Sequence, residues 1–447
     1  MKGIYHKIGL RLSWKILELI TIILLVILLP RDQFGAGFFA LCATSFLKAI
    51  FSFTYIGDQD DREVYAALSM LAPVAGALFS GLIYFLSFFV GESMVAFKFA
   101  SAIILFAGFA LTPEIYFKSR EEYEKVYFTY TISQLAALVV SLGLVLAGQG
   151  FVSVLYGGIA FYIFNTFQLW KLFPYRPSSV VTKEAVAKLL SSVKVSMPSE
   201  LLKAFIKYGP MLFAGIYLGM DDFSHLFFGI TLGYFIFDNI SSYSLGFFKG
   251  MLEDKETRAY AFTRIFEYVS FIAAPLCFVG VAVFRPLLGY MSIGESDIVF
   301  ILLIAGAIRA ILHPAKLVVK DRVQARLMVL ELIMLALLSL AFWSMHGFGL
   351  ALAILIAGTA SSILLVLVAD RKIHFISGAK EAFISIFSGI FSGLYAGLLT
   401  EILGTDISTL VLVYLLGLGA YVLLTFVLNN DLYKRFVKFI FHLREQR

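Results

Sequence analysis

Long apolar stretches follow one another along this chain, and its basic residues gather in every second gap between them. Most of the 36 Lys and Arg residues lie in these gaps, whereas the intervening gaps hold almost none, Arg31 being the clear exception. Lys and Arg are retained on the cytoplasmic side of a membrane, so the alternation orients successive spans. The pattern predicts a multi-pass protein of the plasma or inner membrane with both termini in the cytoplasm.

The apolar stretches are long enough to cross a bilayer, because a hydrocarbon core of about 30 Å needs roughly 20 residues of helix. The composition agrees with this: 60% of the residues are hydrophobic and 15% are charged, against about 45–50% and about 25% in soluble domains. We therefore expect an all-α polytopic membrane protein with about fourteen transmembrane helices. The predicted spans lie near residues 12–30, 34–56, 64–90, 93–117, 125–147, 150–172, 200–220, 223–249, 262–288, 297–317, 324–345, 348–369, 381–402 and 406–428.

An internal repeat divides the predicted spans into two halves. Residues 32–40 and 221–229 share the pattern Asp-x-Phe-x-x-x-Phe-Phe-small, and they follow the first and the seventh span. Both halves therefore enter the membrane in the same orientation, as in a parallel repeat about a pseudo-twofold axis with a substrate site between its halves. The predicted parts are an N-terminal lobe (1–172), a cytoplasmic interfacial linker (173–199), a C-terminal lobe (200–370), spans thirteen and fourteen (371–428) and a basic cytoplasmic tail (429–447).

A few basic residues lie inside the apolar stretches. Lys48, Lys207 and Arg309 fall well inside predicted spans, whereas Lys98 and Arg285 fall nearer the external side. A cation at a helix centre costs about 2.5–3.5 kcal/mol on insertion scales. A water-filled cleft that receives an anion removes much of this cost. We interpret these residues as candidate substrate-binding groups for an anionic substrate.

Buried acids offer a second explanation for the same cations. Asp238 and Glu331 also lie inside predicted spans, where either acid is able to neutralise a neighbouring cation. The side chains of Lys98 and Arg285 are long enough to reach a membrane interface. Asp238 and Glu331 are also candidate sites for a coupling ion or a proton. The sequence leaves these explanations open.

The sequence lacks the patterns of common catalytic and metal sites. It has no Walker phosphate loop, no Gly-x-Ser-x-Gly nucleophile elbow and no zinc-ligand spacing. Cys42 and Cys277 both lie within apolar stretches, so we expect neither a disulfide nor a metal site. The basic gaps flank apolar spans, which favours anionic lipid headgroups rather than nucleic acid as their neighbours. We expect a protein that is not an enzyme and that carries no cofactor.

Three short segments resemble motifs of a known family. The first span closes with residues 28–35, Leu-Leu-Pro-Arg-Asp-Gln-Phe-Gly, which resemble the Leu-Gly-Pro-Glu-x-Phe-Gly turn of polysaccharide flippases. Residues 247–264 and 284–289 are similar to two further helix ends of that family. These flippases are the O-antigen and capsule exporters of the multidrug/oligosaccharidyl-lipid/polysaccharide (MOP) superfamily. In this chain, Arg31 and Asp32 stand where the family usually has Glu and its neighbour.

The resemblance implies a two-lobe transporter of fourteen helices that flips a polyprenyl-pyrophosphate-linked oligosaccharide to the outer leaflet. It implies a cationic cavity between the lobes for the pyrophosphate and glycan, and an extra helix pair consistent with a groove for the lipid tail. The implied partners are the lipid-linked glycan and membrane lipids, with a glycan polymerase and glycosyltransferases as further candidates.

Other functions fit parts of the same sequence. A lipid II-type flippase would share both the fold and the buried cations. A drug or cation antiporter of the same superfamily should have an acidic cavity and usually twelve spans. An O-antigen polymerase or ligase needs a sizeable external domain, and every predicted external gap is short.

Overall fold

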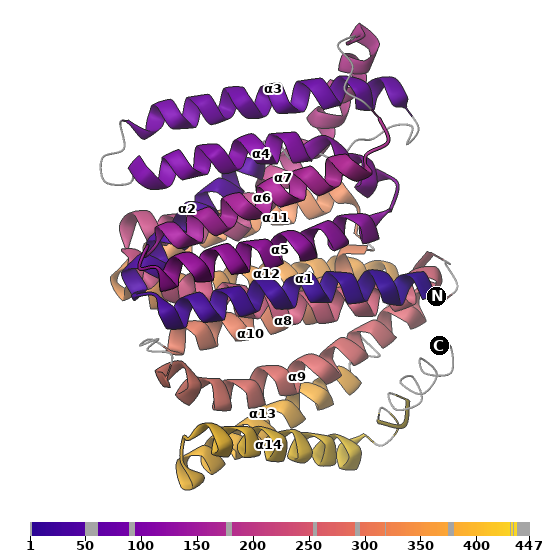
Figure 1. The fold of residues 1–447 in the computed structure, drawn as a ribbon. Coiled ribbons are helices and arrows are strands. Elements are labelled where there is room, and N and C mark those ends of the chain that lie inside the picture. Colours follow the sequence, from indigo (N-terminus) through magenta and orange to yellow (C-terminus); the bar gives the residue numbers. More distant parts are fainter. Residues whose placement is uncertain are drawn as a thin grey trace. The chain divides into compact units, whose positions relative to one another are not determined.

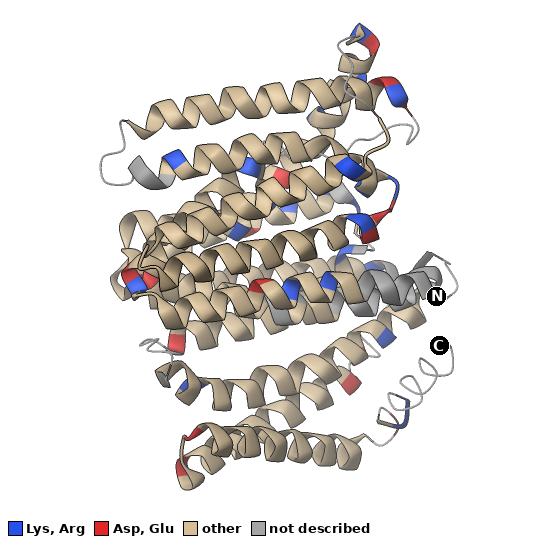
Figure 2. Ribbon diagram, in the orientation of Figure 1, with Lys and Arg blue, Asp and Glu red and all other residues tan. Residues whose placement is uncertain are grey.

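The structure is a computed structural model in which the described residues are 2–49, 61–88, 94–175, 181–253, 257–290, 296–317, 319–373, 380–429, 431 and 433–435. All regular secondary structure in these residues is helical. Figure 2 shows long runs of uncharged ribbon, with most of the charged residues near helix ends. The all-α polytopic fold expected from the apolar stretches is confirmed.

Each predicted span corresponds to one α-helix of the described chain (Figure 1). Ten of these helices, α3–α6 and α9–α14, are long and apolar enough over their described residues to cross a membrane. Two short 3-10 helices, η2 (His313–Leu317) and η3 (Trp343–Met345), accompany them. The α-helices are α1 (Lys2–Leu28), α2 (Arg31–Ala49), α3 (Arg62–Ser87), α4 (Met94–Ser119), α5 (Tyr123–Leu146), α6 (Val152–Leu172), α7 (Lys183–Tyr217), α8 (Met220–Glu253), α9 (Arg258–Tyr290), α10 (Ser296–Leu312), α11 (Asp321–Ala341), α12 (His346–Ile373), α13 (Lys380–Leu403) and α14 (Ile407–Leu428).

The helices form two compact units, which are described separately here. One unit, which we call the N-terminal unit, comprises Gly3–Ser224 and contains α1–α7 with the first turn of α8. The other, which we call the C-terminal unit, comprises His225–Arg447 together with Met1–Lys2. The lobe limits expected from the sequence, 1–172 and 200–370, stay a prediction.

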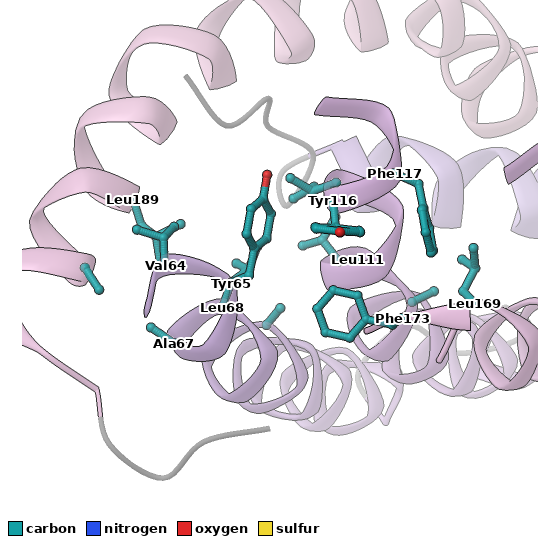
Figure 3. Packing of buried hydrophobic residues seen from close by; sticks show 14 of the residues in the cluster. Val64, Tyr65, Ala67, Leu68, Leu111, Tyr116, Phe117, Leu169, Phe173 and Leu189 are labelled. Atoms are coloured by element: carbon teal, nitrogen blue, oxygen red, sulfur yellow. The ribbon is translucent and has the colours of Figure 1, made fainter. Parts of the chain in front are cut away.

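In the N-terminal unit, α3 and α4 pack closely together. Tyr65 of α3 lies edge-to-face on Tyr116 of α4, with ring centroids 5.0 Å apart (Figure 3). The hydroxyl oxygens of Tyr65 and Ser119 are 2.6 Å apart and share a hydrogen bond. Further along the same pair, a Cβ on Gly76 would lie only 2.9 Å from the Cα of Gly108, so this crossing requires glycine. These contacts fix α4, the helix that carries part of the candidate site.

Helix α7 joins two segments that the sequence separates. The pattern predicts a distinct interfacial helix within 173–199, followed by a span, whereas the structure has one helix from Lys183 to Tyr217. Pro198 lies inside this helix without ending it. Leu189 is buried in the core cluster that contains Val64 of α3, so the first part of α7 packs on α3. Its position at a membrane interface stays a prediction.

Both copies of the sequence repeat begin a helix, α2 from Arg31 and α8 from Met220. The repeated phenylalanines are buried in each copy: Phe34, Phe38 and Phe39 in the first, and Phe223, Phe227 and Phe228 in the second. The motif therefore has the same structural setting twice, at the first turns of a helix with its aromatic side chains turned inward. The pseudo-twofold relation between the two halves stays a prediction.

In the C-terminal unit, α9 is the central support for the last two helices. It packs against α13, α14 and α10, while α12 packs against α10 and α11. A Cβ on Gly393 of α13 would lie 2.7 Å from the backbone oxygen of Phe278 in α9, so the two helices approach closely. The Tyr421 hydroxyl of α14 donates a hydrogen bond to the Phe271 backbone oxygen at 2.8 Å. The extra helix pair is thereby tied to α9.

The turn between α13 and α14 is closed by local hydrogen bonds. Gly404 adopts a φ of +103°, a conformation that glycine reaches without strain. The Asp406 carboxylate accepts hydrogen bonds from the hydroxyls of Ser408 and Thr409, and from the Thr409 backbone N–H at 3.0 Å. These bonds lower the pKa of the Asp406 carboxyl to about 2 and cap the N-terminus of α14.

Candidate functional site

Two helices of the N-terminal unit, α2 and α4, bring charged groups together inside the bundle. Lys48, in the last turn of α2, lies beside Glu114 of α4, with Nζ 3.7 Å from Oε2. Lys118, one turn further along α4, has its Nζ 2.5 Å from Glu114 Oε1. The Glu114 residue is 6% exposed, so its charge depends on these two cations for neutralisation.

Tyrosines surround this charged group. The Lys48 ammonium lies 5.1 Å from the centre of the Tyr162 ring on α6. Tyr130 of α5 lies beside the Glu114 carboxylate. Aromatic faces attract cations within about 6 Å, so Tyr162 gives the Lys48 ammonium a second favourable neighbour besides the carboxylate.

Lys207 of α7 lies near the same group. Its ammonium is 4.9 Å from the centre of the Tyr208 ring, and Tyr208 is also a neighbour of Lys48. The Lys207 side chain is exposed, and no carboxylate of the described residues lies within 4.0 Å of its Nζ. The structure thus places two of the predicted site residues, Lys48 and Lys207, on the adjacent helices α2 and α7, with Tyr208 near both. Their surroundings carry more positive than negative charge.

Arg309 belongs to the C-terminal unit, where it is paired with an acid. Its Nη1 lies 3.0 Å from Glu331 Oε1, and the two side chains are 21% and 9% exposed. Internal pairing, the second explanation drawn from the sequence, therefore describes Arg309 in this structure. Arg309 also lines a small pocket with Gly306, Gly358 and Thr359, at which α10 and α12 meet.

The remaining sequence-predicted residues lie elsewhere. The Lys98 ammonium sits 5.0 Å from the Phe88 ring, roughly 24 Å along α4 from Glu114 at 1.5 Å per residue. Arg285 Nη2 lies 3.5 Å from Asp297 Oδ1 in a pair whose side chains are both largely exposed. The side chain of Asp238 is outside the described residues, although its backbone belongs to α8.

The structure also contains a charged cluster that the sequence analysis missed. The 2%-exposed Glu267 of α9 accepts a 2.6 Å hydrogen bond from Arg264 Nη1, and its carboxylate is 4.0 Å from Arg435 Nη1. Arg435 also donates to Glu381 at the start of α13. The cluster links α9, α13 and the segment after α14. Its signal in sequence is weak, because its members lie at the ends of apolar stretches, where charge is ordinary.

Metal binding finds no support in this part of the chain. Among the described residues, no group of three or more His, Cys, Asp and Glu side chains is close enough to hold an ion. Cys42 and Cys277 are both buried free thiols.

Membrane-length helices that carry cations along their length define a polytopic membrane protein. The chain belongs to the family described as polysaccharide biosynthesis protein, whose family model matches residues 28–296, more than half of its 447 residues. No curated protein matches the chain.

Solved structures with the same fold come from the MOP superfamily. The lipid II flippase MurJ, in an inward closed conformation, has a TM-score of 0.67 and 14% identity, over 96% of this chain and 98% of that one. The eukaryotic MATE transporter AtDTX14 has a TM-score of 0.55 and 16% identity, over 86% and 97%. A MOP superfamily transporter from Pyrococcus furiosus has a TM-score of 0.51 and 15% identity, over 84% and 96%. The polysaccharide biosynthesis family expected from the short motifs is confirmed by the family model, and these solved structures show the fold.

Proposed function

We propose that the chain is a flippase that moves a polyprenyl-pyrophosphate-linked oligosaccharide from the cytoplasmic to the outer leaflet. The observation that carries the proposal is the pair Lys48 and Lys207, two cations on different helices of a membrane-protein fold that share Tyr208 as a neighbour. Lys48 shares its acid, Glu114, with Lys118. The surplus positive charge is suited to a diphosphate, which ammonium groups bind through charge-assisted hydrogen bonds.

In the proposed mechanism, the pyrophosphate lies against Lys48, Lys207 and Arg309 while the lipid tail stays in the bilayer. Two lobes open first toward the cytoplasm and then toward the outside, around a central cationic cleft. Arg309 reaches the substrate only when its pair with Glu331 opens. Lys98 and Arg285 contact the glycan nearer the outer side. No covalent step is required, so the protein acts without catalysis.

Net transport against a gradient needs an energy source. Asp238 and Glu331 are the proposed carriers of a coupling proton or sodium ion, because intramembrane carboxylates commonly serve proton relays. We place the protein in the plasma or inner membrane with both termini in the cytoplasm, where glycosyltransferases supply its substrate. A glycan polymerase on the outer side is the proposed consumer of its product.

A lipid II-type flippase is the second candidate. The fold likeness to MurJ covers 98% of that chain and 96% of this one, and the ammonium groups of Lys48 and Lys207 suit any lipid-linked pyrophosphate. A drug or cation antiporter is disfavoured, because the two lysines Lys48 and Lys118 share the one acid Glu114. Competition between the two lipid-linked substrates in one flipping assay separates the two flippase functions.

Two lysines one turn apart on α7 provide a test with a matched control. We expect Lys207→Ala to lower surface glycan export by about 10- to 100-fold, because a charge-assisted contact contributes about 1.5–3 kcal/mol. Lys203→Ala is the control, since Lys203 is exposed and pairs with Glu200 at 2.7 Å. Surface glycan is measured against the amount of inserted protein. Equal export by both variants and the wild type would contradict the proposed role of Lys207.

A further inference from the structure

The two oxygens of the Glu114 carboxylate are held unequally. Oε1 is 2.5 Å from the Lys118 ammonium, the distance of a strong charge-assisted bond. Oε2 is buried, is 3.7 Å from the Lys48 ammonium and has no hydrogen-bond partner within the described residues. A 3.7 Å separation is too long for a hydrogen bond, although the charges still attract one another. Lys118 is therefore the firm partner of Glu114, and Lys48 is the loose one.

Lys48 already has a second favourable contact besides Glu114. Its side chain is 21% exposed, so its ammonium is not enclosed by Glu114. The Tyr162 ring, 5.1 Å away, offers a cation–π contact that does not depend on the carboxylate. When Lys48 turns away, Glu114 keeps its bond to Lys118 and is not left as an unpaired buried charge. The geometry allows Lys48 to exchange partners at low cost.

We infer that Glu114 is a resident counter-ion for Lys48. An entering phosphate takes the place of Glu114 beside Lys48, and Glu114 displaces that phosphate again before the substrate is released. The inference rests on the proposed function, because it assumes that Lys48 meets a phosphate group. Glu114 is then a positioning residue that acts through Lys48 and does not itself contact the substrate. Its charge sets how tightly an anion is held, and so prevents the lysines from retaining the substrate.

The test measures pyrophosphate affinity in the purified full-length protein. Inorganic pyrophosphate is titrated into the wild type and into Glu114→Gln and Lys118→Ala variants. Glu114→Gln removes the competing anion, so we expect a Kd lower by about tenfold, as for loss of a close partly buried charge pair. Lys118→Ala leaves Glu114 dependent on Lys48 alone, so we expect the Kd to rise. A purely structural role would not move affinity in opposite directions.

A double variant isolates the interaction with Lys48. In a Lys48→Ala background, the further change Glu114→Gln should leave the pyrophosphate Kd unchanged, because Lys48, the ammonium through which Glu114 acts on the bound anion, is absent. Glu114→Asp, which keeps the charge, should stay closer to the wild type than Glu114→Gln. If Glu114→Gln is not recovered as a monodisperse protein, the Lys118→Ala and Glu114→Asp titrations decide the matter alone.

The outcomes separate this inference from the proposed function. Wild-type affinity in both Lys48→Ala and Lys207→Ala would contradict the anion site itself. Weaker binding in those variants, together with unchanged or weaker binding in Glu114→Gln, would overturn the counter-ion role and leave the site standing. In the absence of a usable Glu114→Gln protein, a Lys118→Ala Kd at or below the wild-type value would overturn it equally.

Discussion

Arg309 and Glu331 show that the role of a charge inside a membrane helix depends on which side chains lie beside it. The 3.0 Å pair neutralises a cation that the sequence alone marks as a candidate ligand for substrate. Burying such a pair gains little net stability, because desolvation offsets the attraction. Breaking it is costly, since one charge is then left without a partner. The pair therefore invites a test that measures stability and export in the same variants.

We expect Arg309→Gln to destabilise the protein by about 3–5 kcal/mol, because it leaves the Glu331 carboxylate buried and unpaired. The double variant Arg309→Gln with Glu331→Gln should recover most of that loss. Thermal unfolding of the purified proteins measures their stability, and the amount of surface glycan measures export. The proposed substrate contact predicts a stable double variant that does not export. A stable double variant with full export would show that Arg309 has a structural role only.

At this scale the sequence predicts the cations better than their partners. A basic residue inside an apolar stretch is visible without any structure, as Lys48 and Lys207 are. Glu114 was missed, although its place four residues before Lys118 in the fourth predicted span was an available signal. That Glu114 faces Lys48 depends on the packing of α2 against α4, which no local pattern encodes. Glu331 was named in advance as a neutralising acid, and it pairs with Arg309.

At the scale of elements, the glycines of α13 explain how the last helix pair is attached. A Cβ on Gly393 would meet the Phe278 backbone oxygen at 2.7 Å and the Phe278 Cβ at 2.9 Å. Gly397, one turn further on, has nothing within 4 Å of the same position. Backbone atoms yield less readily than the ends of side chains. The close approach of α13 to α9 therefore depends on the first glycine and not on the second.

Alanine at these two positions should have opposite effects. Gly393→Ala should destabilise the protein by about 1–3 kcal/mol, the usual cost of overpacking a close contact. Gly397→Ala should be neutral or slightly stabilising, because alanine is the better helix former by about 1 kcal/mol. Thermal unfolding of both variants in one detergent provides the comparison. Equal midpoints would mean that α13 does not pack on α9 as described.

Existence and type of the helices follow from the sequence, because each apolar stretch is long and continuous. Their limits follow less well. Helices α8 and α9, at Met220–Glu253 and Arg258–Tyr290, continue beyond the predicted spans 223–249 and 262–288, since polar residues extend a helix once it has begun. In α7, Leu189 packs on α3, and this contact supports the part of the helix that precedes Pro198. A short stretch of sequence gives no information about such tertiary contacts.

At the scale of the whole molecule, each compact unit contains its own buried ion pair. Lys48 and Glu114 lie in the N-terminal unit, and Arg309 and Glu331 lie in the C-terminal unit. The fold is that of the MOP superfamily, at identities of 14–16% to MurJ and AtDTX14. The apolar stretches along the chain predict its polytopic all-α architecture. They do not predict which charges meet, because that depends on contacts between distant segments.

The central claim is that the interior lysines carry a lipid-linked diphosphate across the membrane. The direct measurement uses the purified protein in liposomes that contain a polyprenyl-pyrophosphate-linked oligosaccharide, with an external enzyme that modifies only outward-facing glycan. Wild-type protein should bring nearly all of the glycan within reach, whereas the Lys48→Ala, Lys207→Ala double variant should leave the inner half protected, as in protein-free liposomes. Equal accessibility with the wild type and the double variant, or none above protein-free liposomes with the wild type, would contradict the claim.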